Sequence, residues 1–204
     1  MKKILLLNGS PRKNGQTNTL LIEIQNQCLE YIKSLNKESE ITIEMLQISD
    51  YPIKFCDGCD SCLRKPNVCP KSDEPGDSMN LLEEMITSSN ALIIGAPSYF
   101  GSMPAQLKVF VDRSRPWKMA KYKLKNIVFS AVASAGLANG GLGSTLEGLH
   151  SFAFTHAMVV LPAVGTPQLI PNLVSSTLQG NGVKEFRTFD QLSEVAASSA
   201  KALA

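Results

Sequence analysis

Apolar residues recur along this chain in short runs, separated by segments with a helical spacing. Four continuous runs predict strands that are buried on both faces, as in a parallel sheet, at 4–7, 91–94, 127–129 and 158–161. At 41–45 apolar and polar residues alternate instead, which predicts a strand at the edge of the sheet.

The segments between these runs carry apolar residues at spacings of three and four, which predict helices packed on the sheet. The clearest apolar face consists of Leu20, Leu21, Ile24, Cys28, Ile32 and Leu35. Shorter patterns predict helices near 81–86, near 107–111 after Pro104, near 146–152 and near 195–203. Five strands that alternate with five helices predict a three-layer α/β fold in one domain spanning 1–204.

Composition places the chain among ordinary globular proteins, with 204 residues, 44% hydrophobic and 19% charged. The net charge of +2, without a block of Lys and Arg, gives no indication of nucleic-acid binding. No apolar run reaches the roughly 18 residues of a membrane span. The short apolar run after Lys3 falls below the roughly 7–15 residues of a signal-peptide core. We therefore expect a cytoplasmic protein that binds neither nucleic acid nor membrane.

The loop after the first apolar run predicts a phosphate site. A helix N-terminus favours an anion, and the loop adds hydroxyl, amide and guanidinium donors from Ser10, Arg12, Asn14, Thr17, Asn18 and Thr19. Gln16 replaces the lysine of a P-loop, and the G-x-G-x-x-G fingerprint is missing. FMN, held by its terminal phosphate, fits such a loop, although the same residues also suit a capped strand–turn–helix.

Two later loops predict the surroundings of a flat ring, because ligands of open parallel sheets bind beyond the carboxyl ends of the strands. The third run is followed by Pro97, Ser98, Tyr99, Phe100, Gly101 and Ser102, and the fourth by Ser134, Ala135 and Gly136. Each loop alone also suits an ordinary turn. Three such loops at three strand ends favour a ligand.

The segment 51–77 does not fit the alternation and is long for a connection, which indicates a functional role. It carries the motif C-x2-C-x2-C-x6-C-P, formed by Cys56, Cys59, Cys62 and Cys69. The motif resembles a bacterial ferredoxin run with a lengthened last spacing, and four thiolates can close around one [4Fe–4S] cluster. Zinc, which usually joins two separated C-x2-C knuckles, and a metal-free lid of thiols or a disulfide are the alternatives.

Three further residues with metal-ligating or redox-active side chains are predicted to be structural. Cys28 shares the apolar face of the first helix, which indicates a buried and inert thiol. His150 and His156 have no cysteine or carboxylate at ligand spacing.

The stretches GSPRKNGQTNTLL and APSYFGSMPAQLKVFVDR resemble the NADPH-dependent FMN reductase family, and the cysteine spacing resembles its iron–sulfur flavoprotein branch. The resemblance runs from Lys2 to about Leu161. It implies a flavodoxin-like sandwich with a five-stranded parallel sheet in the order 2-1-3-4-5 and a cysteine-rich insertion after the second strand. It also implies that the first loop binds the FMN phosphate, that 97–102 and 134–136 flank the isoalloxazine ring, and that the four cysteines hold [4Fe–4S].

The resemblance further implies a flavin-dependent oxidoreductase in which the cofactors carry the chemistry, so that no side chain is assigned as catalytic. We expect NAD(P)H or a reduced carrier to reduce FMN, and the cluster to pass electrons to a redox partner protein or a small-molecule acceptor. We also expect a homodimer or homotetramer. The alternatives are an NAD(P)H-dependent FMN or quinone reductase without a cluster, and a flavodoxin-like electron carrier.

Two features of the cysteine-rich segment bear on where it lies. Because it follows the second strand, we expect it to reach the same sheet edge as the flavin. After its last cysteine, Pro75 and Gly76 stand between acidic residues, so that either Asp73 or Asp77 can start the next helix.

Overall fold

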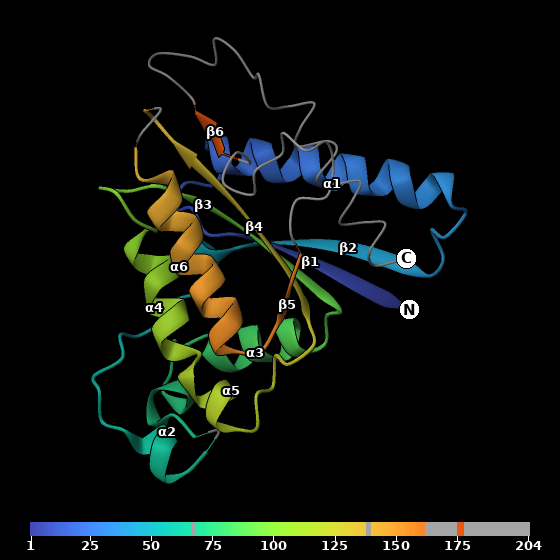
Figure 1. Cartoon of the computed structure of the whole chain (residues 1–204). Coiled ribbons are helices and arrows are strands. Elements are labelled where there is room, and N and C mark those ends of the chain that lie inside the picture. The colour runs from blue at the N-terminus through green and yellow to red at the C-terminus, as the bar shows by residue number, and fades with distance from the viewer. Residues whose placement is uncertain (67, 138–139, 162–174, 178–204) are drawn as a thin grey trace.

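The computed structural model describes residues 1–66, 68–137, 140–161 and 175–177, which form a parallel sheet with helices on both faces (Figure 1). The strands are β1 (Lys2–Asn8), β2 (Ile41–Gln47), β3 (Ala91–Pro97), β4 (Val128–Ala135), β5 (Val159–Val160) and β6 (Ser175–Thr177). Their order is β2-β1-β3-β4-β5, with β6 also paired to β4. The predicted order is confirmed, and β6 is an addition to it.

The burial of each strand follows its place in the sheet. All seven residues of β3, which lies between β1 and β4, are buried. β2 pairs only with β1 among the described strands, and most of its residues are half-buried, as the alternating pattern predicts. β5 is shorter than the predicted 158–161 and pairs with the start of β4, whereas β6 pairs with the end of β4.

The helices divide between the two faces of the sheet. α1 (Gln16–Ser34) covers one face, while the other face carries α3 (Met79–Thr87), α4 (Ala105–Arg113), α5 (Arg115–Met119) and α6 (Leu142–Thr155) (Figure 1). The predicted apolar face of α1 is buried except for Leu35, which ends the helix and is 36% exposed. The helix expected near 195–203 lies outside the described residues.

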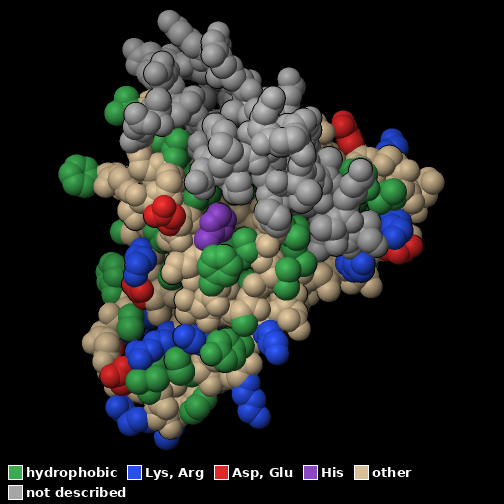
Figure 2. All heavy atoms as spheres, in the orientation of Figure 1, with side chains coloured by type: hydrophobic (Ala, Val, Ile, Leu, Met, Phe, Trp, Pro, Cys, Tyr) green, Lys and Arg blue, Asp and Glu red, His purple; other side chains and the backbone are tan. Residues whose placement is uncertain are grey.

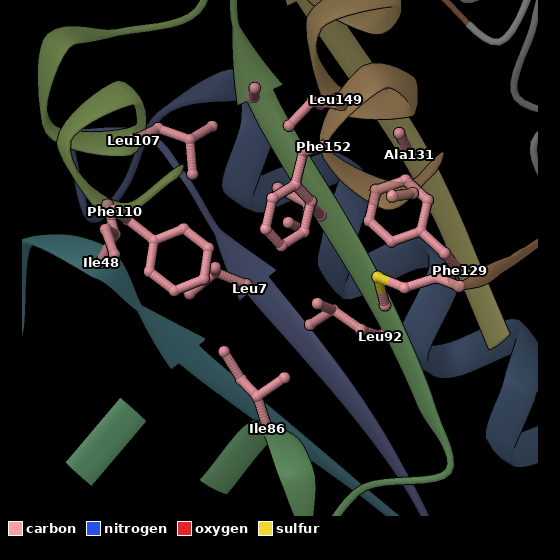
Figure 3. Packing of buried hydrophobic residues seen from close by; sticks show 14 of the residues in the cluster. Leu7, Ile48, Ile86, Leu92, Leu107, Phe110, Phe129, Ala131, Leu149 and Phe152 are labelled. Atoms are coloured by element: carbon pink, nitrogen blue, oxygen red, sulfur yellow. The ribbon is translucent and has the colours of Figure 1, made fainter. Parts of the chain in front are cut away.

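Two apolar cores form because successive residues of β1 point to opposite faces of the sheet. Ile4 and Leu6 pack against α1. Leu5 and Leu7 pack on the other face, where Phe110 of α4 and Phe152 of α6 lie with ring centroids 5.8 Å apart (Figure 3). Within the described part of the chain, no helix combines the length and the apolar character that a membrane span requires.

The short turn η1 (Ile48–Asp50) follows β2, and the described residues of the cysteine-rich segment 51–77 contain only two short helices, α2 (Ser61–Arg64) and η2 (Pro70–Asp73). The segment leaves the sheet after β2 and runs to the end of the molecule where α2 lies next to α5 (Figure 1). Since α5 follows α4 directly, the segment reaches the C-terminal end of α4.

Candidate functional site

The first loop is tied to the ends of β1 and β2 by a buried polar network. Asn8, the last residue of β1, is fully buried, and its Oδ1 accepts a hydrogen bond of 3.0 Å from the Ser10 amide. Its Nδ2 donates to Gln47 Oε1 at 2.7 Å, and Gln47 Nε2 donates to the Ser10 carbonyl at 2.5 Å. The Ser10 hydroxyl accepts from the Arg12 amide at 3.0 Å. The backbone of the loop is thus held in place by protein groups alone.

Asn8 and Gln47 were not among the site residues predicted from the sequence. Both stand at the end of their strands, and a polar residue that closes an apolar run such as Ile4–Leu7 is the signal that marks them. Their side chains satisfy each other and the loop backbone, which buried amides require.

The N-terminus of α1 is open toward this loop. The helix begins at Gln16, with Gly15 as an extended N-cap residue, and within the described residues no side chain caps it. Its first turn contains no acidic residue. Four of the predicted phosphate-side residues face solvent at least in part, namely Arg12, Asn14, Asn18 and Thr19. The helix N–H groups and these donors fit an anionic group, whereas Ser10 and Thr17 are buried and support the loop from within.

Hydrogen bonds join the loops at the carboxyl ends of β1, β3 and β4. Thr17 Oγ1 and Ser134 Oγ lie 2.8 Å apart, and both residues are buried. The Ser98 amide donates to the Ser134 carbonyl at 2.6 Å, and the Ser98 hydroxyl donates to the Gly140 carbonyl at 2.5 Å. The predicted phosphate-side and ring-side residues therefore come together at one edge of the sheet.

The loop after β3 is a tight hairpin with an exposed tip. The Tyr99 amide donates to the Ser102 carbonyl at 2.7 Å, and the Ser102 amide donates back at 3.3 Å. The two residues at the tip have positive φ angles, 50° at Phe100 and 86° at Gly101. The Phe100 side chain is fully exposed, whereas Pro97 is buried at the end of β3. The hairpin thus presents an aromatic ring at the surface.

The third loop lies directly against this hairpin. Gly141 has a φ of 84°, and a Cβ atom placed there would lie 2.4 Å from the Gly101 Cα. Gly136 is exposed, with no atom within 4 Å of the place a Cβ would take, while Ser134 and Ala135 are buried. Gly136 therefore leaves open space next to the strand end, of the kind a ligand ring needs.

The four cysteines of the predicted motif line a single cavity. They are Cys56, Cys59, Cys62 and Cys69. The first two are exposed, the other two are half-buried, and all are free thiols. Residues of α4 and α5 form the opposite wall, among them Arg113, Arg115 and Pro116. Figure 2 shows Lys and Arg side chains gathered at this end of the molecule, over α2 and α5.

The cysteine cavity does not lie at the sheet edge where we expected it. Ala105, at the start of α4, follows the ring-side hairpin, whereas Arg113, at its end, lines the cavity. A helix of nine residues rises by about 12 Å from its first to its last residue. The cysteine-rich segment begins at the sheet edge, but its short turns carry the thiols to the far end of α4.

A buried ion pair fastens the cysteine-rich segment to α4. Arg113 Nη1 lies 2.7 Å from Asp77 Oδ2, and the two side chains are 1% and 0% exposed. Arg113 also donates to the Lys54 carbonyl at 2.6 Å and to Ser72 Oγ at 2.9 Å. Asp77 accepts from the amides of Lys54, at 2.9 Å, and Met79, at 3.0 Å. One contact therefore holds both ends of the segment.

This geometry also decides where the helix after the segment starts. α3 begins at Met79, and the Asp77 carboxylate accepts the Met79 amide, so Asp77 and not Asp73 precedes the helix. Burial acts to raise the pKa of Asp77, but hydrogen bonds from Arg113 and the two amides outweigh it and hold that pKa below its usual value.

The cysteines differ in their electrostatic surroundings. Burial raises the pKa of Cys62, and the nearby charge of Arg115 opposes that rise. Charges on Cys69 and Cys56 raise it further, which indicates that these thiols lie within electrostatic reach of each other. Burial raises the pKa of Cys28 to about 12, and the prediction of a buried thiol there is confirmed.

His156 is a structural residue of the α5–α6 contact. It is 2% exposed, and its Nε2 lies 2.9 Å from Ser114 Oγ. The Ser114 hydroxyl donates to the Val111 carbonyl at 2.7 Å, so Nε2 carries the proton and donates to Ser114. Burial lowers the pKa of His156 to about 4, with a smaller contribution from Lys118. The imidazole is therefore neutral at pH 7.

Within the described residues, no group of three or more His, Cys, Asp and Glu side chains lies close enough to hold a single metal ion. The four cysteines nevertheless line one cavity.

Comparisons with known proteins agree with this geometry. Residues 2–168 match the family of NADPH-dependent FMN reductases. Over 203 residues the chain is 37% identical to an iron–sulfur flavoprotein of Archaeoglobus fulgidus, covering 99% of this chain and 92% of that protein. Two solved structures share the fold. The flavoenzyme NAD(P)H:(acceptor) oxidoreductase FerB of Paracoccus denitrificans is 17% identical, with a TM-score of 0.64 over 98% of this chain and 96% of its own. A flavodoxin from the domain Archaea is 12% identical, with a TM-score of 0.56 over 98% of both chains.

Proposed function

This chain belongs to the NADPH-dependent FMN reductase family, in its iron–sulfur flavoprotein branch, and we propose that it passes electrons between FMN and a [4Fe–4S] cluster. It is a flavin-dependent oxidoreductase. When bound, FMN would accept an electron pair and return it one electron at a time, and the cluster would exchange single electrons. The observation that carries the proposal is the single cavity lined by all four cysteines of the motif.

At the sheet edge, the protein binds and orients the flavin. The open N-terminus of α1 and the donors of the first loop, Arg12 foremost, take the phosphate. The hairpin with Tyr99 and Phe100 and the open space beside Gly136 take the isoalloxazine ring. Because Asn8, Gln47 and Ser134 hold the loops from inside, the edge is preorganised for its ligand.

At the far end of α4, Cys56, Cys59, Cys62 and Cys69 would supply the thiolate ligands of the cluster. Half-burial of two of the cysteines limits contact with water, and the positive charge of Arg115 on α5 acts on Cys62 in the sense that favours a thiolate. All four thiols are free, which supports a cluster over a disulfide lid.

The separation of the two sites by α4 favours a route that includes a second copy of the chain. Phe100, at the hairpin tip, and Phe55, at the start of the cysteine-rich segment, are both exposed. We propose a homo-oligomer in which such aromatic residues are covered, and a redox partner protein or small acceptor that receives the electrons.

The test is the content and spectrum of protein purified and reconstituted without oxygen. We expect about one FMN, four iron atoms and four sulfides per chain, with a broad absorbance beneath the flavin bands that bleaches with dithionite. Cys59→Ser should lose iron, sulfide and the broad absorbance but keep FMN, whereas Cys28→Ser should keep all of them. A flavin spectrum without iron in the wild type contradicts the proposal.

A further inference from the structure

The wall of the cysteine cavity contains two arginines that differ in burial. Arg115 follows Arg113 after one residue, and both line the cavity with the four cysteines. The Arg115 side chain is 40% exposed, and its Nη1 pairs with Asp60 at 2.8 Å. The Arg113 side chain is 1% exposed. Any group held by the cysteines therefore meets one exposed and one buried guanidinium.

One nitrogen donor of the Arg113 guanidinium, Nε, has no hydrogen-bond partner among the described residues. Nη1 donates to the Lys54 carbonyl and to Asp77 Oδ2, and Nη2 donates to Ser72 Oγ and to Asp77 Oδ1. Nε is buried and has no partner among the described residues. Since a buried N–H without an acceptor is costly and rare, this donor calls for an acceptor that the protein itself does not provide.

The cavity beside Arg113 is where such an acceptor belongs. Its lining from the cysteine-rich segment includes four cysteine sulfurs, and the thiolate and sulfide sulfurs of an iron–sulfur group accept hydrogen bonds. Hydrogen bonds to these sulfurs are one of the factors that set the reduction potential of such a group. The positive charge of Arg113 is already balanced by Asp77. What Arg113 can add to the cavity is therefore its unpaired Nε–H donor.

We propose that the Nε–H of Arg113 donates a hydrogen bond to a sulfur of the group that the four cysteines hold, and that it thereby positions this group and raises its reduction potential. The inference rests on the proposed function. Reduction adds one electron, from dithionite or the reduced flavin, and no bond forms or breaks. The sulfurs become more negative and accept the hydrogen bond more strongly, so the donor favours the reduced form.

A matched pair of substitutions tests this role. Arg113→Lys keeps the charge opposite Asp77 but removes the Nε–H, and Arg115→Lys makes the same change at the exposed position. Gln106→Ala, at an exposed position of α4 that does not line the cavity, is the control for the helix. Anaerobic redox titration of each variant, followed by electron paramagnetic resonance of the reduced cluster, measures the potential. Iron and sulfide assays measure how much cluster remains.

We expect the potential of Arg113→Lys to shift to more negative values, by more than that of Arg115→Lys, with no shift in Gln106→Ala. A merely structural Arg113 would lower stability and cluster content while the clusters that remain keep the wild-type potential, and that result overturns the inference. If the wild type itself assembles no iron, the proposed function fails as well, and the iron assay separates this outcome from the other.

A measurement on the wild type keeps the test independent of how Arg113→Lys folds. Protein labelled with ¹⁵N-arginine and reduced at the cluster should show coupling between the electron spin and one arginine nitrogen in pulsed electron paramagnetic resonance. Arg115→Lys should retain this coupling. Its absence from the wild type would overturn the proposed hydrogen bond.

Discussion

The two ends of α4 carry two sites that are built in different ways. At its start, three loops leave three neighbouring strands, and their positions are fixed by the sheet and by buried contacts such as Thr17–Ser134. At its end, a long segment without a core of its own is fastened by the Arg113–Asp77 pair. The first site is held by the sheet itself, whereas the second is fastened to the rest of the protein chiefly by one buried ion pair.

The largest effect should come from removing the carboxylate of that contact. Asp77→Ala leaves Arg113 buried without a counter-charge and should cost about 3–5 kcal/mol of unfolding free energy. Urea unfolding measures this loss, and limited proteolysis should cut within 51–77 first. Asp73→Ala, at an exposed position of the same segment, should change stability by less than about 0.5 kcal/mol. Equal effects of the two substitutions would show that the contact does not hold the segment.

Low pH should reduce the stability of the protein, because His156 must take up a proton in a buried position. Its pKa is about 4 in the folded chain and about 6.5 in an unfolded one, so the unfolded state takes up the proton first. Stability is therefore complete above about pH 6.5 and is lost as the pH falls toward 4, by about 3 kcal/mol at most. Urea unfolding at pH 7, 5.5 and 4.5 measures this. His156→Gln should remove most of that slope, and an unchanged slope would place its origin elsewhere.

At the sheet edge, the close approach of two loops should be sensitive to one methyl group. Gly141→Ala forces a side chain into the left-handed region and against Gly101. We expect a loss of about 1–2 kcal/mol and weaker FMN binding, measured by flavin fluorescence. Gly143→Ala, where a Cβ has open space, is the matched control. FMN affinity equal in both variants would contradict the role given to the Gly141–Gly101 contact.

A smaller effect is expected from the hydrogen bond between the first and third loops. Thr17→Val leaves the buried Ser134 hydroxyl without its partner and should cost about 1–2 kcal/mol, with a modest fall in FMN affinity. Thr42→Val on the edge strand β2 should be nearly neutral, since Thr42 makes only an exposed contact at 3.5 Å. A Thr17→Val protein with wild-type stability and affinity would show that this bond does not set the loop.

The comparison also explains what the sequence could predict. The strands and the three loops follow from local patterns, because the buried runs of β1, β3 and β4 and the small or polar residues after them are adjacent in the chain, whereas the sheet order was implied by the family resemblance. The buried ion pair between Arg113 and Asp77 joins residues that are 36 positions apart in the sequence. Nothing in the local stretches VDR or PGDS indicates that pairing, so neither the true position of the cysteine cavity nor the choice of Asp77 over Asp73 near the start of α3 followed from the sequence.

The polar residues at the ends of β1 and β2 could be predicted from the sequence only in part. Asn8 and Gln47 interrupt apolar strands, which is visible in the sequence, but their shared bond of 2.7 Å depends on the register that pairs them. Short strands are also hard to foresee. β6 has three residues, and only its pairing with the end of β4 marks it as a strand.

The central claim, that one chain carries both a flavin and a one-electron group, is tested most directly by counting electrons. Protein reconstituted without oxygen is titrated with dithionite while its absorbance is followed. FMN takes two electrons and a [4Fe–4S] cluster takes one, so we predict about three electrons per chain for the wild type and about two for Cys59→Ser. An uptake of about two electrons by both proteins would contradict the account.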